Sequence, residues 1–474
     1  MIPLTLAEVA AATGGALHDA PDPGARVLGP VVVDSRQVAP GALFVAVPGE
    51  RADGHDFAAA AVAGGAAGVL ATRPVGVPAV VVDDAVAALG RLARAVLERL
   101  PDLLVVGVTG SSGKTSTKDL LAAVLEPLGE TVAPEGSYNN ELGVPLTVLR
   151  ATPTTRHLVL EMGARGEGHV AQLCRTAPPR IGVVLNVGSA HVGEFGGREA
   201  IARAKGELVE ALPPAEQGGV AVLNADDHLV VGMAPRTAAR VVRTGLADTA
   251  DVRALDAGLG EGGRARFVLA ARGGTAPVQL RLVGEHHVGN ALAAAAVALE
   301  AGATVQGTAE ALSGAAPRSR WRMEVTEAPG GFTVVNDAYN ANPESVRAAL
   351  KALVGMAGGR RTWAVLGEMR ELGAASAEEH DAVGRLAVRL DVSRLVVVGD
   401  GARPMHLGAS LEGSWGEESV FVPDVAHAVA LLREEVAPGD VVLVKASRAA
   451  GLERVAEALL ADGAPAAPGA GAGA

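Results

Sequence analysis

The stretch GVTGSSGKTS, residues 107–116, constrains the fold of this chain more than any other sequence feature. It follows an apolar run, LLVV, and precedes a helical pattern, TKDLLAAVLEPL. Glycines let backbone N–H groups curl around phosphate oxygens, and the N-terminus of the next helix adds positive potential. The order strand, glycine-rich loop, helix therefore predicts an α/β domain that binds a phosphate chain. The match is imperfect, because Val108 stands where the G-x-x-x-x-G-K-[ST] pattern has its first glycine.

The loop also supplies candidate binding residues. Lys114 is placed to reach the terminal phosphates, and Thr115 to hold Mg²⁺. The residues expected to contact the phosphate chain are Gly110, Ser111, Ser112, Gly113, Lys114, Thr115 and Ser116. The alternative is a glycine-rich turn beside a surface lysine.

Length and charge narrow the possible functions. A chain of 474 residues suggests about three domains. Its 41 basic and 53 acidic residues give a net charge of −12, which disfavours nucleic acid as a partner. Only Lys114, Lys118, Lys205, Lys351 and Lys445 are lysines, so the chain uses arginine for most positive charges, and some of these lysines could serve amine chemistry.

Cysteine content and hydropathy bear on the compartment. The single cysteine, Cys174, excludes an intrachain disulfide framework, and this fits a reducing compartment. We expect Cys174 to be a helix-packing residue rather than a nucleophile. The N-terminus has no secretory pattern, and the apolar run from Ala58 to Thr72 is short for a membrane span. We therefore expect a cytoplasmic protein without membrane insertion.

Strand-like and helical patterns alternate along the chain and predict three α/β domains. Residues 1–100 are expected to form a small α/β domain, and 101–315 a parallel sheet with crossover helices and a mostly antiparallel flank at 240–283. The segment AAPRSRWR, 315–322, is typical of a linker. Residues 316–462 predict a Rossmann-like doubly wound domain, and the Ala/Gly/Pro tail 463–474 is expected to be disordered.

Two polar residues follow strand-like runs of the central region. Glu161 ends the run HLVLE, and His191 follows GVVLNVGSA. The carboxyl ends of parallel strands deliver ligands to one crevice, so this carboxylate and imidazole could complete a magnesium shell. Either could instead be a loop or capping residue. Lys205, in AIARAKGEL, is by itself typical of a solvated helix lysine.

At this point the chain resembles a known family over essentially its whole length. The segments GVTGSSGKTS, SYNNELGVP, EMGA, NVGSAHVGEF, AKGEL, GEHHVGN, NDAYNANPES and LVKASR are similar, in order and spacing, to those of the Mur ligases, ATP-dependent amino-acid-adding enzymes of peptidoglycan synthesis in the bacterial cell wall. The phosphate-binding loop of that family has the same offset glycine. NDAYNANP followed by GEMRELG resembles the members that add D-alanyl-D-alanine to UDP-MurNAc-tripeptide.

The resemblance implies a catalytic group made of Lys114, Glu161, His191, Lys205 and Arg322. It further implies two Mg²⁺ ions held by Thr115, Glu161, His191 and Lys205, the last as a carbamate formed with CO₂. ATP would also be bound by Asn290 at the adenine, Arg322 at the γ-phosphate, Asp337 at the ribose, and Asn340. For Asn340 and Asn342, turn formation before Pro343 is an equally good explanation.

Other residues would bind the remaining substrates. VDSRQVAPGALFVAVPGERADGHDF resembles a UDP-binding segment, which implicates Ser35 and Arg36, with Asp53 and His55 as weaker candidates. Asn139 and Asn140, in SYNNELGVP, are further substrate-binding candidates. Lys445, Ser447 and Arg448 end the last strand, and the sequence leaves their anion open. Sites drawn from three domains suggest a monomer that closes on its substrates.

Three rival functions remain on the sequence alone. A diamino-acid-adding member of the same family typically carries a DYAHTP-type segment and a DNPR motif, and both are missing. A folylpolyglutamate synthase would lack the UDP-type N-terminal segment. A non-catalytic nucleotide-binding module on the same scaffold is the third, because a fold does not fix a function.

Overall fold

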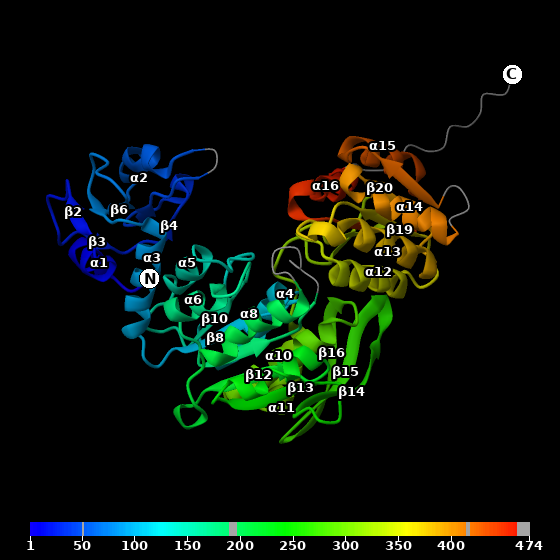
Figure 1. Ribbon diagram of the computed structural model, residues 1–474, viewed down its shortest axis with the longest axis horizontal. Coiled ribbons are helices and arrows are strands. Elements are labelled where there is room, and N and C mark those ends of the chain that lie inside the picture. Colours follow the sequence, from blue (N-terminus) through cyan, green and yellow to red (C-terminus); the bar gives the residue numbers. More distant parts are fainter. Residues whose placement is uncertain (50–51, 189–196, 414–417, 462–474) are drawn as a thin grey trace.

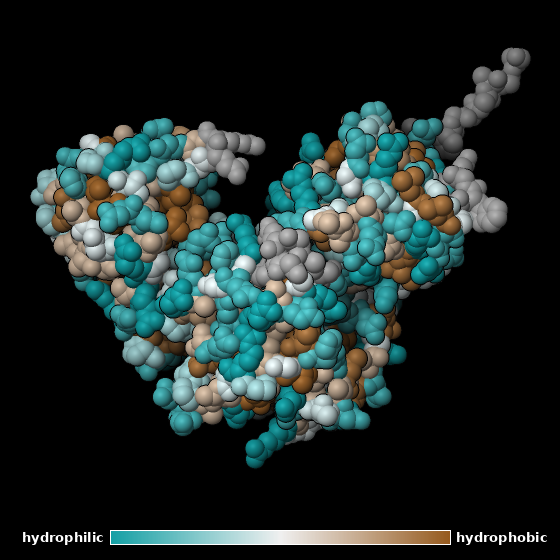
Figure 2. Space-filling view, in the orientation of Figure 1, coloured by the Kyte–Doolittle hydropathy of each residue, from teal (hydrophilic) through white to brown (hydrophobic). Residues whose placement is uncertain are grey.

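The computed structural model describes residues 1–49, 52–188, 197–413 and 418–461. Two arms, formed by the N-terminal and C-terminal regions, rise from opposite ends of a central region (Figure 1). The space-filling view shows a hollow between the arms (Figure 2). No helix in the described part of the chain combines the length and apolar character needed to cross a membrane.

The N-terminal arm is a small α/β unit. A short ribbon pairs β1 (Leu4–Thr5) with β3 (Arg26–Val27), and the main sheet has the order β2-β7-β6-β5-β4 with only β2 antiparallel. These strands are β2 (Ala16–His18), β4 (Val31–Val32), β5 (Leu43–Val45), β6 (Gly68–Ala71) and β7 (Ala79–Val81). Its helices are α1 (Leu6–Thr13), α2 (Ala58–Ala63) and α3 (Ala85–Glu98).

Helix α3 joins this arm to the central region. It begins after Asp84, whose carboxylate accepts the N–H groups of Val86 and Ala87. Its apolar residues, such as Leu92 and Val96, belong to one continuous core that extends to Leu160 in the central sheet. Burial of this shared face therefore holds the first arm on the central region.

The central sheet has the order β16-β15-β14-β13-β12-β11-β8-β10-β9. Its strands are β8 (Leu104–Thr109), β9 (Thr131–Val132), β10 (His157–Glu161), β11 (Ile181–Val184), β12 (Val220–Asn224), β13 (Arg240–Gly245), β14 (Val252–Leu259), β15 (Arg264–Ala271) and β16 (Gly274–Val283). Its helices are α4 (Lys114–Leu125), α5 (Gly143–Val148), α6 (His169–Thr176), α8 (Arg198–Glu210), α9 (His228–Val231), α10 (His287–Glu300) and α11 (Val305–Gly314). Valine- and leucine-rich runs such as β8 and β10 are buried, as parallel strands covered on both faces must be.

The predicted mostly antiparallel flank at 240–283 is confirmed, because β14 pairs antiparallel with β15 and β15 with β16. The first strand of this range is the exception: β13 runs parallel to β12, and β14 parallel to β13. The reason is that α9, a single helical turn between β12 and β13, returns the chain to the same end of the sheet, so β13 keeps the direction of β12.

The C-terminal arm is a doubly wound sheet with the order β17-β18-β22-β19-β20-β21, in which only β17 is antiparallel. Its strands are β17 (Glu324–Glu327), β18 (Thr333–Asn336), β19 (Thr362–Leu366), β20 (Arg394–Val398), β21 (Ser419–Val422) and β22 (Val441–Lys445). Its helices are α12 (Pro343–Ala357), α13 (Ser376–Arg389), α14 (Arg403–Glu412), α15 (Val425–Glu435) and α16 (Glu453–Ala461). The α/β class with a doubly wound C-terminal sheet is thus confirmed, while the predicted disordered tail, 463–474, lies outside the described residues.

Candidate active site

The glycine-rich loop joins β8 to α4, as the sequence predicts. Gly113 caps α4 with φ 80°, a backbone conformation that L-residues with a side chain rarely adopt. A Cβ at this position would also lie 2.5 Å from Oδ1 of Asn290, at the start of α10. The loop therefore needs glycine both for its turn and for its close approach to α10. Lys114 folds back, and its Nζ donates to the Gly110 carbonyl at 2.7 Å.

Asn186 holds the first half of the loop, a role that the sequence did not reveal. Its Oδ1 accepts the N–H groups of Ser111 and Ser112, each at 3.0 Å, and its Nδ2 donates to the Ser112 carbonyl at 3.2 Å. The N–H groups at the start of α4 have no acceptor within the helix. Those of Gly113, Lys114 and Thr115 are therefore the best placed to meet a phosphate.

Thr115 and Glu161 form the metal-binding candidate at the carboxyl ends of the strands. The buried Thr115 hydroxyl donates to Oε2 of Glu161 at 3.0 Å, and Nδ2 of Asn139 donates to Oε1 at 2.9 Å. Ser137 Oγ lies 3.0 Å from Thr115 Oγ1. A hydroxyl and a carboxylate are hard oxygen donors and suit Mg²⁺. Among the described residues there is no cluster of three or more His, Cys, Asp or Glu side chains that could hold a metal ion.

Lys205 lies on α8 and is buried, with a relative exposure of 3%. It is therefore not the solvated helix lysine that its local sequence alone suggests. Burial and then the nearby Lys114 ammonium lower the pKa of Lys205 well below its ordinary value. Burial likewise lowers the pKa of Lys114, although the Glu161 carboxylate opposes this shift. This shift favours the uncharged form of the Lys205 amine, which is the form that reacts as a nucleophile.

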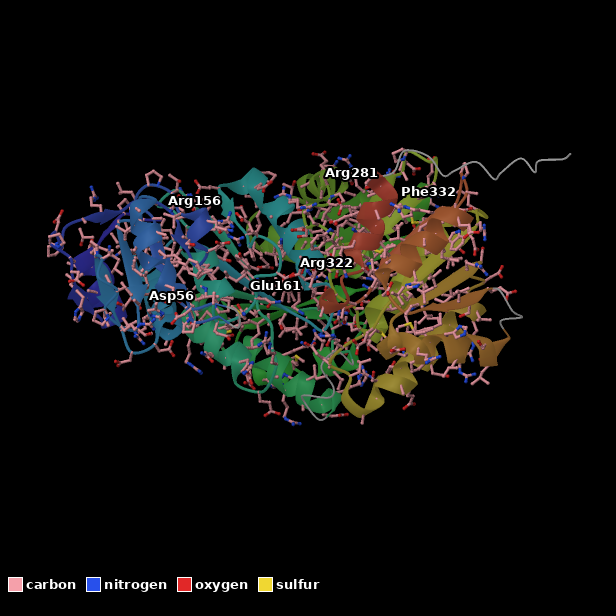
Figure 3. All side chains as sticks on the ribbon, turned by 90° about the horizontal axis from the view of Figure 1, so that it is seen from above. Asp56, Arg156, Glu161, Arg281, Arg322 and Phe332 are labelled. Atoms are coloured by element: carbon pink, nitrogen blue, oxygen red, sulfur yellow. The ribbon has the colours of Figure 1, made fainter. Side chains whose placement is uncertain are left out.

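Arg322 brings a positive charge from the linker to the same point. Its Nη2 lies 3.3 Å from Thr115 Oγ1 and 3.4 Å from Ser137 Oγ, and its guanidinium stacks 4.3 Å from the ring centroid of Tyr339. Figure 3 shows Arg322 and Glu161 close together near the middle of the molecule, far from Asp56 and Phe332 in the two arms.

These side chains line one cavity of about 480 Å³ between the central and C-terminal regions. Even with Lys205 counted as uncharged, the described lining carries more cationic residues, namely Lys114, Arg165, Arg322 and Arg370, than acidic ones, namely Glu141, Glu161 and Glu371. A locally positive cavity in a chain of net charge −12 is suited to a small polyanion such as a nucleoside triphosphate.

Comparisons with known proteins agree with this geometry. Family models for the Mur ligase middle domain match residues 108–298, those for the Mur ligase glutamate ligase domain match 321–448, and those for the Mur ligase family catalytic domain match 30–101. UDP-N-acetylmuramoyl-tripeptide–D-alanyl-D-alanine ligase of Mycobacterium tuberculosis (strain H37Rv) is 55% identical, with 98% of each chain covered. The chain belongs to the Mur ligase family.

Solved structures of this family superpose on the present Mur ligase. The crystal structure of MurF from Acinetobacter baumannii matches with a TM-score of 0.86 and 31% identity, over 97% of this chain and 99% of that one. MurF ligase from Thermotoga maritima in complex with ADP matches with a TM-score of 0.78 and 32% identity, over 91% and 97%. The resemblance inferred from the ordered motifs is confirmed.

Within this Mur ligase, the predicted ribose-binding residue already has partners. Asp337 Oδ2 accepts from Lys445 Nζ at 2.6 Å, and its Oδ1 accepts from the Met323 N–H at 3.1 Å. Lys445 also donates to the Asn340 carbonyl at 2.8 Å. The sequence left open which anion Lys445 meets, and in the structure this anion is the Asp337 carboxylate. The ion pair holds the turn that follows β18.

The other asparagines contact the loop or cap helices. Asn290 Nδ2 lies 3.4 Å from Nδ1 of His287, whose pKa is lowered well below its ordinary value by burial. Asn342 caps α12 through Ser345 and also donates to the Ser111 carbonyl at 3.4 Å, so the C-terminal arm touches the phosphate-binding loop. Asn140 Oδ1 accepts the Gly143 N–H at 2.8 Å at the start of α5, and Asn140 also lines the cavity.

Several predicted residues lie elsewhere. Ser35 and Arg36 begin a helical turn in the N-terminal arm, where the largely exposed Arg36 pairs with Asp34 at 2.7 Å. Asp53 accepts from His55, and the His55 ring in turn accepts from the Thr72 N–H. None of these residues lines the cavity described above.

The remaining predicted site residues are His191, Ser447 and Arg448. His191 lies outside the described residues. Arg448 pairs with Glu453 at 2.7 Å and stacks on Trp321, and Ser447 Oγ accepts the Arg370 N–H at 2.9 Å. Lys445, Ser447 and Arg448 therefore have three different protein partners rather than one common anion.

Proposed function

We propose that this Mur ligase adds D-alanyl-D-alanine to UDP-MurNAc-tripeptide, with conversion of ATP to ADP and phosphate, and so forms the UDP-MurNAc-pentapeptide precursor of peptidoglycan. The observation that carries the proposal is the cavity that unites Lys114, the Thr115–Glu161 pair, Lys205 and Arg322, in a chain so similar to a relative of that name. A non-catalytic module would have no need for this combination of charges.

The chemistry has two steps. An oxygen of the tripeptide carboxylate attacks the γ-phosphorus of ATP, the bond to the β-phosphate oxygen breaks, and ADP leaves with that electron pair. The amine of D-alanyl-D-alanine then attacks the acyl carbon, loses a proton, and expels phosphate. Activation is needed because a free carboxylate is a poor acyl donor.

In the first step, the residues of the site would offset the repulsion between the tripeptide carboxylate and the γ-phosphate of ATP. Lys114 and Arg322 would both contact the γ-phosphate and stabilise the charge that spreads over its oxygens. Bound Mg²⁺, held by Thr115 and Glu161, would neutralise part of the phosphate charge. Asn139, by donating to Glu161, would keep that carboxylate turned toward the metal.

Lys205 would carry a carbamate. The uncharged amine attacks the carbon of CO₂, an N–C bond forms, and a proton is released, so that a cation becomes an anionic oxygen ligand. Burial and the nearby Lys114 favour the uncharged amine that this reaction needs. Arginine could not replace it, because its guanidinium stays protonated.

The roles of Asn290, Asp337, Asn340, Ser35, Arg36 and His191 in binding ATP, UDP or a second Mg²⁺ belong to this proposal. So do the domain limits 1–100, 101–315 and 316–462. Monomeric state and cytoplasmic location stay predictions from the sequence.

Phosphate release tests the function directly. We expect phosphate release only when ATP, Mg²⁺, a UDP-MurNAc-tripeptide and D-alanyl-D-alanine are all present, with the pentapeptide detected by mass. Release that requires L-glutamate and a folate, or a diamino acid and a UDP-dipeptide, would refute the proposal in favour of a rival family member.

A further inference from the structure

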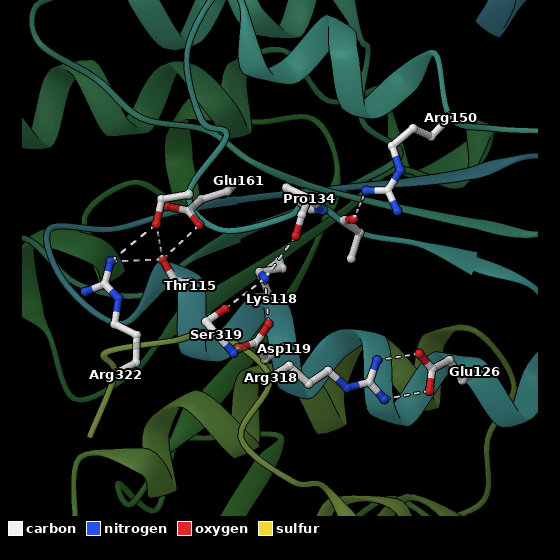
Figure 4. A network of polar contacts seen from close by, with 12 residues as sticks. Thr115, Lys118, Asp119, Glu126, Pro134, Arg150, Glu161, Arg318, Ser319 and Arg322 are labelled. Atoms are coloured by element: carbon white, nitrogen blue, oxygen red, sulfur yellow. Dashed lines mark hydrogen bonds and ion pairs between the residues drawn. The ribbon is translucent and has the colours of Figure 1, made fainter. Parts of the chain in front are cut away.

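Lys118, on α4, is a buried cation outside the substrate cavity. Its relative exposure is 3%, and its ammonium group has three acceptors around it. Nζ lies 2.5 Å from Asp119 Oδ1, 3.1 Å from the Pro134 carbonyl and 3.2 Å from Ser319 Oγ (Figure 4). A lysine ammonium has three N–H donors, so this environment matches its full donor capacity.

Asp119 is the neighbour of Lys118 on α4, but the other two partners, Pro134 and Ser319, belong to two segments outside this helix. Ser319 is in the linker, and its N–H also donates to Asp119 Oδ2 at 3.0 Å. The neighbouring Arg318 forms a two-pronged ion pair with Glu126, also on the α4 side of the linker. The linker is therefore fastened along α4 rather than free between the two regions.

The same two segments deliver the groups that flank Thr115. Arg322 follows Ser319 by three residues, and Ser137 follows Pro134 by three. Thr115 and Lys118 lie one turn apart on the same face of α4. Arg322 Nη2 reaches both Thr115 Oγ1, at 3.3 Å, and Ser137 Oγ, at 3.4 Å. Lys118 thus anchors the linker one helical turn below the point where Arg322 meets the phosphate-binding loop.

We propose that Lys118 is a positioning residue for phosphoryl transfer, because it clasps the linker through Ser319 and Asp119 and so holds Arg322 at the γ-phosphate. This inference rests on the proposed function in one respect, the contact of Arg322 with ATP. Arginine should not substitute for Lys118, because a planar guanidinium cannot direct its donors to three acceptors spread around a single nitrogen.

Kinetics of substituted enzymes test the clasp. Lys118→Met should lower kcat by about tenfold to 10²-fold, as expected when a charged group shifts by about 1 Å, with a much smaller change in KM for the UDP-tripeptide. Lys118→Arg should not restore kcat. The exposed Lys351 on α12 provides the matched control, and Lys351→Met should retain the kcat of the unaltered enzyme.

A double-mutant cycle tests whether Lys118 acts on kcat through Arg322. Combined with Arg322→Ala, which itself lowers kcat, Lys118→Met should reduce kcat by less than about twofold more, because the two residues act as one unit. Equal losses in the two backgrounds, or an unchanged kcat in Lys118→Met alone, would overturn the proposal. Ser319→Ala removes only the linker contact of a half-buried residue, and it should lower kcat in the same Arg322-dependent way even if Lys118→Met does not fold.

Limited trypsin digestion tests the clasp without any assumption about the reaction. In Lys118→Met and Ser319→Ala, cleavage after Arg318 and Arg320 should become faster than in the unaltered protein and in Lys351→Met, as read by the masses of the fragments. An unchanged cleavage rate would overturn the clasp. Faster cleavage in a protein whose unaltered form releases no phosphate would support the clasp and refute the proposed function instead.

Discussion

Replacement of Gly113 by alanine separates two demands on the phosphate-binding loop. The backbone at Gly113 has φ 80°, and the new Cβ would lie 2.5 Å from Asn290 Oδ1. The left-handed backbone strains the folded state of the alanine variant whatever surrounds it. The new Cβ must in addition push aside the Asn290 side chain, which is proposed to bind adenine. Gly113→Ala should therefore impair both stability and nucleotide affinity.

The two costs can be estimated separately. A left-handed backbone costs an L-residue with a side chain about 1–2 kcal/mol. Ordinary contact begins at 3.4 Å, so the Asn290 amide must retreat by roughly 0.9 Å, which is enough to lose its hydrogen bond to a ligand. A polar group left unpaired costs about 1–3 kcal/mol, which corresponds to about a 5- to 150-fold weaker affinity.

Gly168 provides a matched control. It also caps a helix, α6, with a positive φ of 90°, but a Cβ there would meet nothing within 4 Å. Gly168→Ala should show the same loss of unfolding free energy in urea with unchanged ADP affinity by calorimetry, whereas Gly113→Ala should show both losses. Equal ADP affinity in the two variants would refute the reasoning about Asn290.

Three further predictions concern other buried groups. Lys205→Ala should lose activity by at least about 10²-fold, with partial rescue by small carboxylic acids but no rescue of Lys205→Arg; full activity of the unrescued variant would contradict the carbamate. Burial raises the pKa of the Cys174 thiol to about 12, so a thiol reagent should label it only after denaturation, and rapid labelling of the folded protein would contradict this. The His380 ring accepts the Met369 N–H at 2.9 Å, and burial lowers its pKa below 6.5. Below that pH the unfolded chain binds the proton more readily, so unfolding free energy should fall from pH 7 to pH 5, and less steeply in His380→Gln; parallel pH profiles would contradict this.

The sequence predicts those parts of the site that depend on local order. Gly113, Lys114 and Thr115 are fixed by a strand, a loop and a helix that follow one another, and Glu161 by its place at the end of a buried strand. The predicted three-part α/β organisation likewise follows from the alternation of patterns. The parallel pairing of β13 within the mostly antiparallel flank could not be predicted, because a half-buried strand shows the same alternation whether its neighbour is parallel or antiparallel.

Contacts between distant segments could not be predicted in this way. Asn186 meets the loop from 74 residues away, and Lys118 meets Ser319 from 201. Neither contact leaves a periodic signal, because a single polar side chain at a strand end or on a helix is compatible with many neighbours. The abundance of arginine marked the lysines as unusual, but that alone did not distinguish Lys118, a clasp, from Lys205, a candidate ligand.

The positions of the contacts between the central region and the C-terminal arm explain why the linker must be held firmly. The arm packs closely at the turn before β15, where a Cβ on Gly263 would lie 2.8 Å from Met356 Cβ. At the site, by contrast, the hydrogen bonds from Asn342 to the loop and from Arg322 to Thr115 are 3.4 and 3.3 Å long. A rotation of the arm about the packed turn would move Asn342, because Asn342 lies at the other end of α12 from Met356. A linker clasped to α4 would keep Arg322 beside Thr115 during such a rotation, which is what its proposed contact with the γ-phosphate requires.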